Sequence, residues 1–165
     1  MIDRNSEKCN IWAVMTGTSG NKWDLFKEKE IIAAILNDEE KHPDDFNLFV
    51  NEIKKGDIVL ALRAGSTIQG VGRVMSDYIH PEDKGNPGEA GYNHVYSVKW
   101  IIRKDNHINK EDGKSPLFGP YTDNGAVRKI NCDDYEKIKD QYLEVGIDFN
   151  SFKELKIEPV FSMIF

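Results

Sequence analysis

The chain has 165 residues, of which 39% are hydrophobic, 30% charged and 10% aromatic, and its formal net charge at pH 7 is −6. This length and composition suit one folded domain and exclude a low-complexity or collagen-like chain. The negative charge argues against strong non-specific adhesion to nucleic acid, and no apolar run approaches the ~18–20 residues that span a bilayer.

The first half of the chain alternates short apolar segments with polar loops. Asn10–Met15 is predicted to form a buried strand, because it is apolar and rich in aromatic and β-branched residues. From Trp23, spacings of three and four predict a short amphipathic helix that runs into the apolar segment Ile31–Leu36. The charged loop Asn37–Asp45 follows, and Phe46–Ile53 is predicted to form a second short helix.

The middle of the chain predicts a β-hairpin. Lys54–Asp57 is a turn signal, and Ile58–Leu62 is predicted to be a buried strand. Arg63–Ser66 turns the chain into a second strand, Ile68–Met75. The two glycines of the QGVGR stretch interrupt this strand and indicate a bulge or sharp curvature.

The second half predicts fewer elements. Residues 81–91 form a loop rich in Gly, Pro and charge, and Val95–Ile102 is predicted to be a strand. Lys104–Val127 is loop-like, and Asp133–Val145 is predicted to be a helix with acidic residues near its N-terminus. Residues 146–165 are expected to be a tail that forms a last strand or begins a linker.

Several short strands with glycine turns and few helices predict an α+β fold. We expect a small, strongly curved β-barrel with flanking short helices. It is expected to be one domain over residues 1–165, with 1–10 as a lead-in.

The cysteines and histidines indicate a protein without metal or cofactor. Cys9 and Cys132 form no CxxC pair, and the four histidines show neither HExxH nor HxH spacing. We therefore expect reduced thiols, no metal site and no cofactor. The polar start MIDRNSEKCN lacks the apolar stretch of a signal peptide, so a cytoplasmic location is expected.

The sequence lacks the motifs of common catalytic sites. It contains no GxxxxGK[ST] phosphate loop, no GxGxxG order and no GxSxG elbow. Asp133 and Asp134 are explained by helix capping more simply than as paired acids. We therefore expect a binding domain and not an enzyme, with any NTPase or nuclease activity in other segments or partner chains.

Three stretches carry a family resemblance: WDLFKEKEIIAAI, FVNEIKKGDIVLALRAGSTIQGVGRVMSDY and YNHVYSVKWI. They resemble the EVE and EVE-like domains of the PUA-like superfamily over about Ile11 to Arg103. The likeness is greatest to the N-terminal DNA-binding domains of McrB-type, modification-dependent restriction proteins. YTH domains, which bind methylated adenine in RNA, are more distantly similar. The stretch KKGDIVLALRAGSTIQGVGRV is the specific part.

The resemblance implies a pocket for a flipped, modified base, expected to be methylated, in duplex DNA. An extruded base loses stacking worth a few kcal/mol, and aromatic stacking in a cage returns roughly 1–3 kcal/mol per base. Such a domain would target a McrBC-like restriction system that includes an AAA+ motor and a nuclease, with no membrane partner. The alternatives are a stand-alone PUA-like protein that binds modified or structured RNA, and a small enzyme or small-molecule sensor.

The resemblance also implies the pocket residues, which are expected to be Met15, Thr16, Gly17, Trp23, Leu36, Tyr78, Tyr92 and Asp133. Relatives carry a cage tryptophan just after the helix, whereas this chain is aliphatic there. An aliphatic wall, a substitute aromatic such as Trp12 or Tyr78, and a different ligand are all open explanations.

A local excess of positive charge favours a phosphate-facing patch. Residues 51–110 carry nine Lys or Arg against seven Asp or Glu, inside an otherwise acidic chain. Solvated charges on loops and strand edges would explain the same excess. The residues expected to contact the nucleic-acid backbone are Lys22, Arg63, Arg73, Arg103 and Lys104.

Overall fold

The computed structural model describes residues 10–15, 22–34, 47–63, 67–88, 94–103, 127–144 and 146–155. The strands in these ranges are β1 Ile11–Met15, β2 Ile31–Ala34, β3 Ile58–Arg63, β4 Thr67–Val74, β5 His94–Arg103 and β6 Val127–Ile130. The α-helices are α1 Trp23–Lys29 and α4 Cys132–Glu144. Shorter helical turns are the π-helical η2 Leu48–Glu52 and the 3-10 turns η5 Phe149–Ser151 and η6 Lys153–Leu155.

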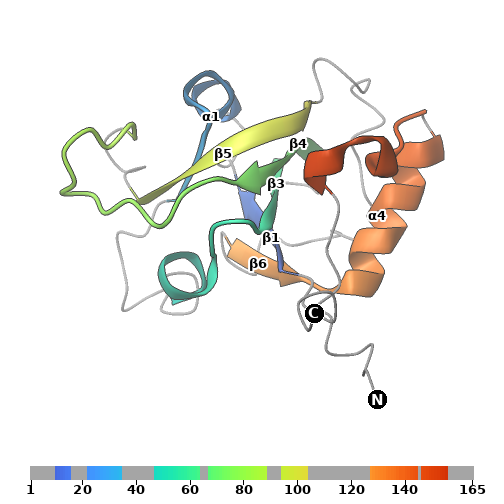
Figure 1. The fold of residues 1–165 in the computed structure, drawn as a ribbon, viewed down its shortest axis with the longest axis horizontal. Helices are drawn as coiled ribbons and strands as arrows, with labels where there is room; N and C mark the ends of the chain where they lie inside the picture. The colour runs from blue at the N-terminus through green and yellow to red at the C-terminus, as the bar shows by residue number, and fades with distance from the viewer. Residues whose placement is uncertain are drawn as a thin grey trace, which may run out of the picture.

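The strands form one sheet in the order β2-β5-β4-β3-β1-β6. β1 and β3 run parallel, and the other neighbouring strands run antiparallel, including the predicted β3–β4 hairpin. Figure 1 shows β5 lying steeply across β1, so the sheet is strongly curled. The predicted α+β fold, with a strongly curved sheet and short flanking helices, is therefore confirmed.

Alternate side chains of the strands enter two apolar cores on opposite faces of the sheet. On β1, Trp12 and Val14 belong to the core that α1 and η2 cover, which we call the inner core. Ile11 and Ala13 belong to the core that α4 covers, which we call the outer core. Because strand side chains alternate between faces, a strand covered on both sides is apolar along its whole length.

The turn before β3 anchors the first strand. The backbone N–H of Asp57 donates to the carbonyl oxygen of Lys54 at 3.0 Å, and Gly56 between them has a φ of 97°, which favours glycine. One carboxylate oxygen of Asp57 accepts hydrogen bonds from Lys54 N (2.8 Å) and from Trp12 Nε1 (2.9 Å). The predicted turn is confirmed, and its aspartate ties the turn to β1.

Two glycines of β4 lie where a side chain would not fit. A Cβ on Gly70 would clash with the ring of Trp23, and a Cβ on Gly72 would lie 2.6 Å from the carbonyl oxygen of Lys99 and 3.0 Å from Cε3 of Trp100. The two indoles meet edge to face, with ring centroids 4.9 Å apart. The register between β4 and β5 shifts immediately before Gly72, so the irregularity predicted at these glycines is confirmed.

The apolar segment after α1 forms a strand. The helix ends at Lys29, because Glu30 adopts a left-handed conformation (φ 54°) and its N–H caps the carbonyl of Phe26. Ile31–Ala34 then pairs antiparallel with β5 as β2, and all four side chains are buried. The sequence identified the segment as apolar but did not predict its pairing.

The C-terminal part differs from the prediction in two places. β6 occupies a stretch without a predicted strand and pairs antiparallel with β1. The tail turns through η5 and η6 where a last strand was one expectation, and residues 156–165 lie outside the described residues. The predicted helix is confirmed as α4, and its first turn is capped by Asn131, whose side chain accepts from Asp134 N at 2.8 Å.

Cys132, the first residue of α4, is disulfide-bonded, which corrects the expectation of a reduced thiol. Cys9, the other cysteine of the sequence, lies outside the described residues. The expectation rested on separation along the chain, whereas the β1–β6 pairing sets Ile130, two residues before Cys132, opposite Ile11.

Candidate nucleic-acid interface

Tyr78 lies at a corner of the sheet where three segments meet. Beyond β4, the backbone of Ile79 exchanges two hydrogen bonds with Val95 of β5, at 2.8 and 3.3 Å. On the other side of β5, His94 pairs with Ala34, the last residue of β2. The corner therefore joins the end of β2, the start of β5 and the segment after β4.

The ring of Tyr78 is half-buried and is held by aromatic neighbours. Its hydroxyl lies 2.6 Å from Nδ1 of His94, and the planes of the two rings differ by 17° at a centroid distance of 6.0 Å. Tyr96 packs against it at a tilted angle (5.9 Å), and His80 meets it edge to face (6.1 Å). We call these four residues the aromatic corner.

Burial sets the protonation of the central pair. Burial, with a smaller contribution from Asp83, raises the pKa of the Tyr78 hydroxyl above its ordinary value. Burial, and then His80, lower the pKa of His94 below its ordinary value. Both groups are therefore neutral at pH 7. We assign the hydroxyl as donor, Nδ1 of His94 as acceptor and the imidazole proton to Nε2.

The loop after Tyr78 is closed by its own hydrogen bonds. The backbone N–H of His80 donates to the carboxylate of Asp83 (2.9 Å), and the ring Nδ1 of His80 accepts from Glu82 N (3.1 Å). The side chain of Asn86 donates to the carbonyl of His80 (3.0 Å) and accepts from Gly88 N (2.7 Å). These bonds hold the exposed His80 next to the ring of Tyr78.

Tyr96 connects the aromatic corner to the inner core. Its side chain is fully buried, and its hydroxyl donates to the carbonyl oxygen of Phe49 in η2 at 2.6 Å, with the carbonyl of Ile53 at 3.1 Å. The rings of Phe49 and Tyr96 meet edge to face at 5.1 Å. Tyr78 therefore rests on a residue that is itself fixed to the inner core.

The two predicted tryptophans are part of the inner core. Trp23 is 7% exposed and packs on Gly70 and Trp100, and Trp12 is 2% exposed with its indole N–H on Asp57. Of the candidate substitutes for the cage tryptophan, Trp12 is buried and Tyr78 is half-buried.

Other predicted pocket residues are not brought to Tyr78. Met15 packs against the outer core, and Asp133 is exposed at the start of α4, which covers the outer core. Both therefore lie on the face of the sheet opposite the inner core. The remaining predicted pocket residues lie outside the described residues: Thr16, Gly17, Leu36 and Tyr92.

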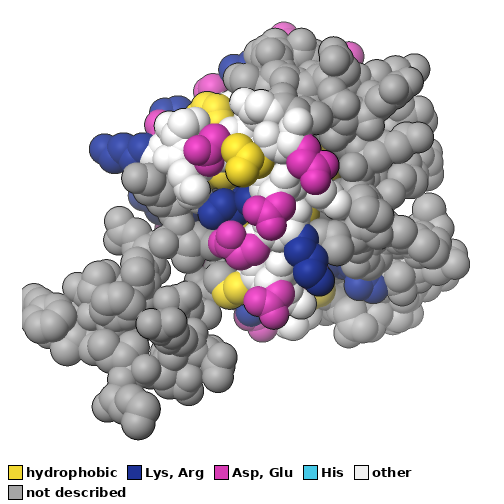
Figure 2. All heavy atoms as spheres, turned by 90° about the vertical axis from the view of Figure 1, so that its right-hand side faces the viewer, with side chains coloured by type: hydrophobic (Ala, Val, Ile, Leu, Met, Phe, Trp, Pro, Cys, Tyr) yellow, Lys and Arg dark blue, Asp and Glu magenta, His cyan; other side chains and the backbone are white. Residues whose placement is uncertain are grey.

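The outer face of α4 is acidic. Figure 2 shows several carboxylate side chains on this side of the molecule, with apolar and basic side chains among them. The helix carries five acidic residues against two lysines: Asp133, Asp134, Glu136, Asp140 and Glu144 against Lys137 and Lys139. A polyanion is repelled from this face.

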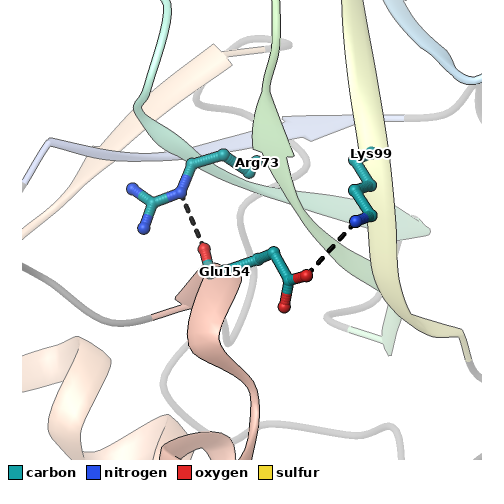
Figure 3. Close-up of polar contacts among 3 residues, drawn as sticks. All are labelled: Arg73, Lys99 and Glu154. Atoms are coloured by element: carbon teal, nitrogen blue, oxygen red, sulfur yellow. Dashed lines mark hydrogen bonds and ion pairs between the residues drawn. The ribbon is translucent and has the colours of Figure 1, made fainter.

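The predicted cation Arg73 is engaged within the protein. Its Nε donates to the carbonyl oxygen of Glu154 (2.7 Å), and the carboxylate of Glu154 pairs with Lys99 (3.2 Å), as Figure 3 shows. A second guanidinium nitrogen of Arg73 donates to the carbonyl of Gly56. Arg73 thus joins η6 to the turn before β3.

The other predicted cations lie at strand and helix ends. Lys22 precedes α1, and Arg103 ends β5 opposite Gly70. Arg63 ends β3, its side chain is not described, and Lys104 lies outside the described residues.

Three members of the aromatic corner were not predicted as site residues: His80, His94 and Tyr96. His94 and Tyr96 stand in YNHVYSVKWI, one of the stretches that carry the family resemblance. The histidines were considered only as metal ligands, so their pairing with Tyr78 was missed.

The described part of the chain contains no cluster of three or more His, Cys, Asp or Glu that could hold a metal ion. No described helix is long and apolar enough to cross a membrane.

A family model described as "Domain of unknown function (DUF8426)" matches residues 13–116. A comparison with curated proteins finds no match. The NMR structure of Rpa0253 from Rhodopseudomonas palustris is similar over 84% of this chain and 96% of that one, with 14% identity and a TM-score of 0.50. This likeness concerns the fold alone.

Two further solved structures have lower scores. One is the YTH domain of the Zygosaccharomyces rouxii MRB1 protein in complex with N6-methyladenosine RNA, which matches over 81% of this chain and 86% of that one, with 14% identity and a TM-score of 0.48. The other is Atu2648 from Agrobacterium tumefaciens, which matches over 84% and 94%, with 13% identity and a TM-score of 0.47.

Proposed function

We propose a function for a chain that belongs to the family described as a domain of unknown function, DUF8426: it binds a modified base in nucleic acid and catalyses no reaction. The aromatic corner carries the proposal. Its central ring, Tyr78, is half-buried, packs against Tyr96 and is held at its hydroxyl by His94. A ring that is accessible and already fixed suits stacking against an extruded base.

The pocket would be completed by residues close in sequence to the corner. Leu36 follows Ala34 of β2 by two residues, and Tyr92 precedes His94 of β5 by two. An aliphatic and an aromatic side chain beside Tyr78 would supply the apolar cage that a methylated base requires. Thr16 and Gly17 stay in the proposal as residues at the lip of the pocket.

Electrostatics supports an approach from the side away from α4. The acidic face of that helix repels phosphates, and the net charge of −6 limits contacts that are independent of the base. Affinity would therefore depend mainly on the base in the pocket. The resemblance to McrB-type domains leads us to propose duplex DNA as the ligand and a restriction system with a motor and a nuclease as the setting.

Fluorescence polarisation tests this function. The probes are duplexes that carry 5-methylcytosine or N6-methyladenine, the unmodified duplex, and single-stranded RNA with N6-methyladenosine. A methyl group adds about 0.8 kcal/mol of burial, so we expect about fourfold tighter binding of one modified duplex. Absent binding, or equal binding of modified and unmodified duplexes, would contradict the proposal. Preference for the RNA would favour the RNA-binding alternative.

The variant Tyr78→Ala removes the proposed stacking surface. It should weaken binding of the preferred duplex by about 1–3 kcal/mol, because it loses one base–aromatic stack. Leu143→Ala is the matched control, since Leu143 is 55% exposed on α4 and should not affect binding. Trp23→Ala is a poor test, because it would disrupt the inner core. Circular dichroism verifies that each variant is folded.

A further inference from the structure

We propose that His94 is a positioning residue: its Nδ1 holds the ring of Tyr78 in the orientation that accepts a base. This inference rests on the proposed function. The observation behind it is the 2.6 Å contact between the Tyr78 hydroxyl and Nδ1 of His94, with the two ring planes only 17° apart.

The backbone of His94 is well fixed. The residue opens β5 and pairs with Ala34 of β2, and its neighbour Val95 exchanges backbone hydrogen bonds with Ile79. The imidazole therefore projects from a strand that is paired on both sides. It offers a fixed acceptor to a side chain from a different segment.

Tyr78 itself lies beyond the end of β4. Two hydrogen bonds hold this segment to β5. The backbone N–H of Met75 donates to the carbonyl oxygen of Ser97 (2.8 Å), and the backbone N–H of Ser97 donates to the hydroxyl of Ser76 (2.9 Å). These bonds fix the backbone before Tyr78 but leave its side-chain torsions free. Tyr96 packs on one side of the ring, and the bond to His94 fixes the far end.

Fixing the ring before a base arrives lowers the cost of binding. A side chain that must be immobilised on binding loses rotamer entropy, whereas one held in place beforehand does not. The low pKa of His94 favours this role, since a neutral imidazole keeps Nδ1 as an acceptor at pH 7.

Four variants and one conservative replacement test the positioning role in the modified-duplex assay. His94→Leu removes the acceptor and Tyr78→Phe removes the donor, and each should weaken binding about 3–10-fold, as expected for one hydrogen bond. The double variant should bind no more weakly than either single one, because both remove the same bond. Leu143→Ala, at an exposed position on α4 and outside the aromatic corner, should stay within twofold (about 0.4 kcal/mol) of the wild type.

The conservative replacement is His94→Asn, whose side-chain oxygen is attached through the same number of bonds as Nδ1. It should restore binding to within about twofold of the wild type, since an oxygen at that point can accept the hydroxyl. Additive losses in the double variant, or no recovery with asparagine, would overturn the positioning role.

A nitrogen-15 NMR spectrum of the free protein separates this inference from the proposed function. The spectrum should show His94 protonated on Nε2, with an Nδ1 signal that shifts in Tyr78→Phe. If the wild type distinguishes modified from unmodified duplexes but His94 carries its proton on Nδ1, the positioning role fails and the proposed function stands. If the wild type binds no modified nucleic acid, the proposed function fails first.

Discussion

Asp57 joins the turn before β3 to β1 through one carboxylate oxygen. It accepts the backbone N–H that closes the turn at Lys54 and the indole N–H of Trp12 on β1. The residue is 7% exposed, so the charge is partly removed from water. Burial raises the pKa of the carboxyl above its ordinary value, although both hydrogen bonds and the nearby Lys129 and Arg73 act in the opposite direction.

Replacing Asp57 by Asn should therefore give a pH-dependent change in stability. A raised pKa in the folded state stabilises the protein fully below the unfolded pKa of about 3.8, and this stabilisation is lost as pH rises through the folded pKa. Asparagine cannot ionise, so its free energy of unfolding relative to wild type should increase as pH rises from 3 towards 7. Urea unfolding across this range measures the difference.

The control for this prediction is Asp57→Ala. It removes the acceptor of two hydrogen bonds and should be less stable than the wild type at every pH, by about 1–3 kcal/mol. A difference between the Asn variant and wild type that does not change with pH would show that the carboxyl titrates normally in the folded protein.

Among the elements, β5 and α4 carry buried tyrosines whose hydroxyls differ in hydrogen bonding. The hydroxyl of Tyr96 satisfies a carbonyl of the π-helical turn η2. Tyr142 of α4 is also buried in an apolar core, but its hydroxyl has no hydrogen-bond partner among the described residues, and the same is true of Tyr135. Burial raises the pKa of all three hydroxyls, so each is neutral at ordinary pH.

Replacing tyrosine by phenylalanine should therefore change the free energy of unfolding differently at Tyr96 and at Tyr142. Tyr96→Phe leaves the carbonyl of Phe49 without its donor and should lower the free energy of unfolding by about 1–3 kcal/mol. Tyr142→Phe removes only a buried, unpaired hydroxyl and should leave stability unchanged or raise it. Urea unfolding of both variants tests this contrast, and equal losses would contradict it.

The elements that the sequence did not predict are the short ones. β2 and β6 have four residues each, too few to show an alternation of apolar and polar side chains. They form because β2 pairs with the edge of β5 and β6 pairs with the edge of β1. The longer elements were predicted close to their observed ends. The hairpin β3–β4 and the helix α4 carry patterns of their own, namely glycine turns and an amphipathic period.

For the whole molecule, the charge distribution sets an upper limit on how steeply binding depends on salt. Arg73 is engaged with backbone carbonyls, so at most four of the predicted cations can face phosphates: Lys22, Arg63, Arg103 and Lys104. Each phosphate contact contributes about −0.9 to the slope of log K against log salt concentration, so the slope should be no steeper than about −4.

Titrations of the preferred duplex between about 50 and 200 mM salt measure this slope. Lys137→Glu on α4 is the control and should leave it unchanged, because that face already repels phosphate. A slope steeper than about −6 would mean that many more phosphates are bound than these cations allow.

The sequence by itself determined the curved α+β fold, the turn at Asp57 and the irregular strand around Gly70 and Gly72. Each depends on local chemistry: apolar runs of strand length, an aspartate after a glycine turn, and two glycines inside an otherwise strand-like stretch. Such features are visible because neighbouring residues in the chain produce them.

Only the tertiary structure decided which aromatic residues remain accessible. Trp23 and Tyr78 are both aromatic residues beside polar segments, yet folding places Trp23 over Gly70 and sets Tyr78 beside His94, 16 residues further along the chain. It also assigns Arg73 to internal carbonyls and Asp133 to the opposite face of the sheet. These outcomes depend on strand order and register, and therefore on contacts between residues far apart in sequence.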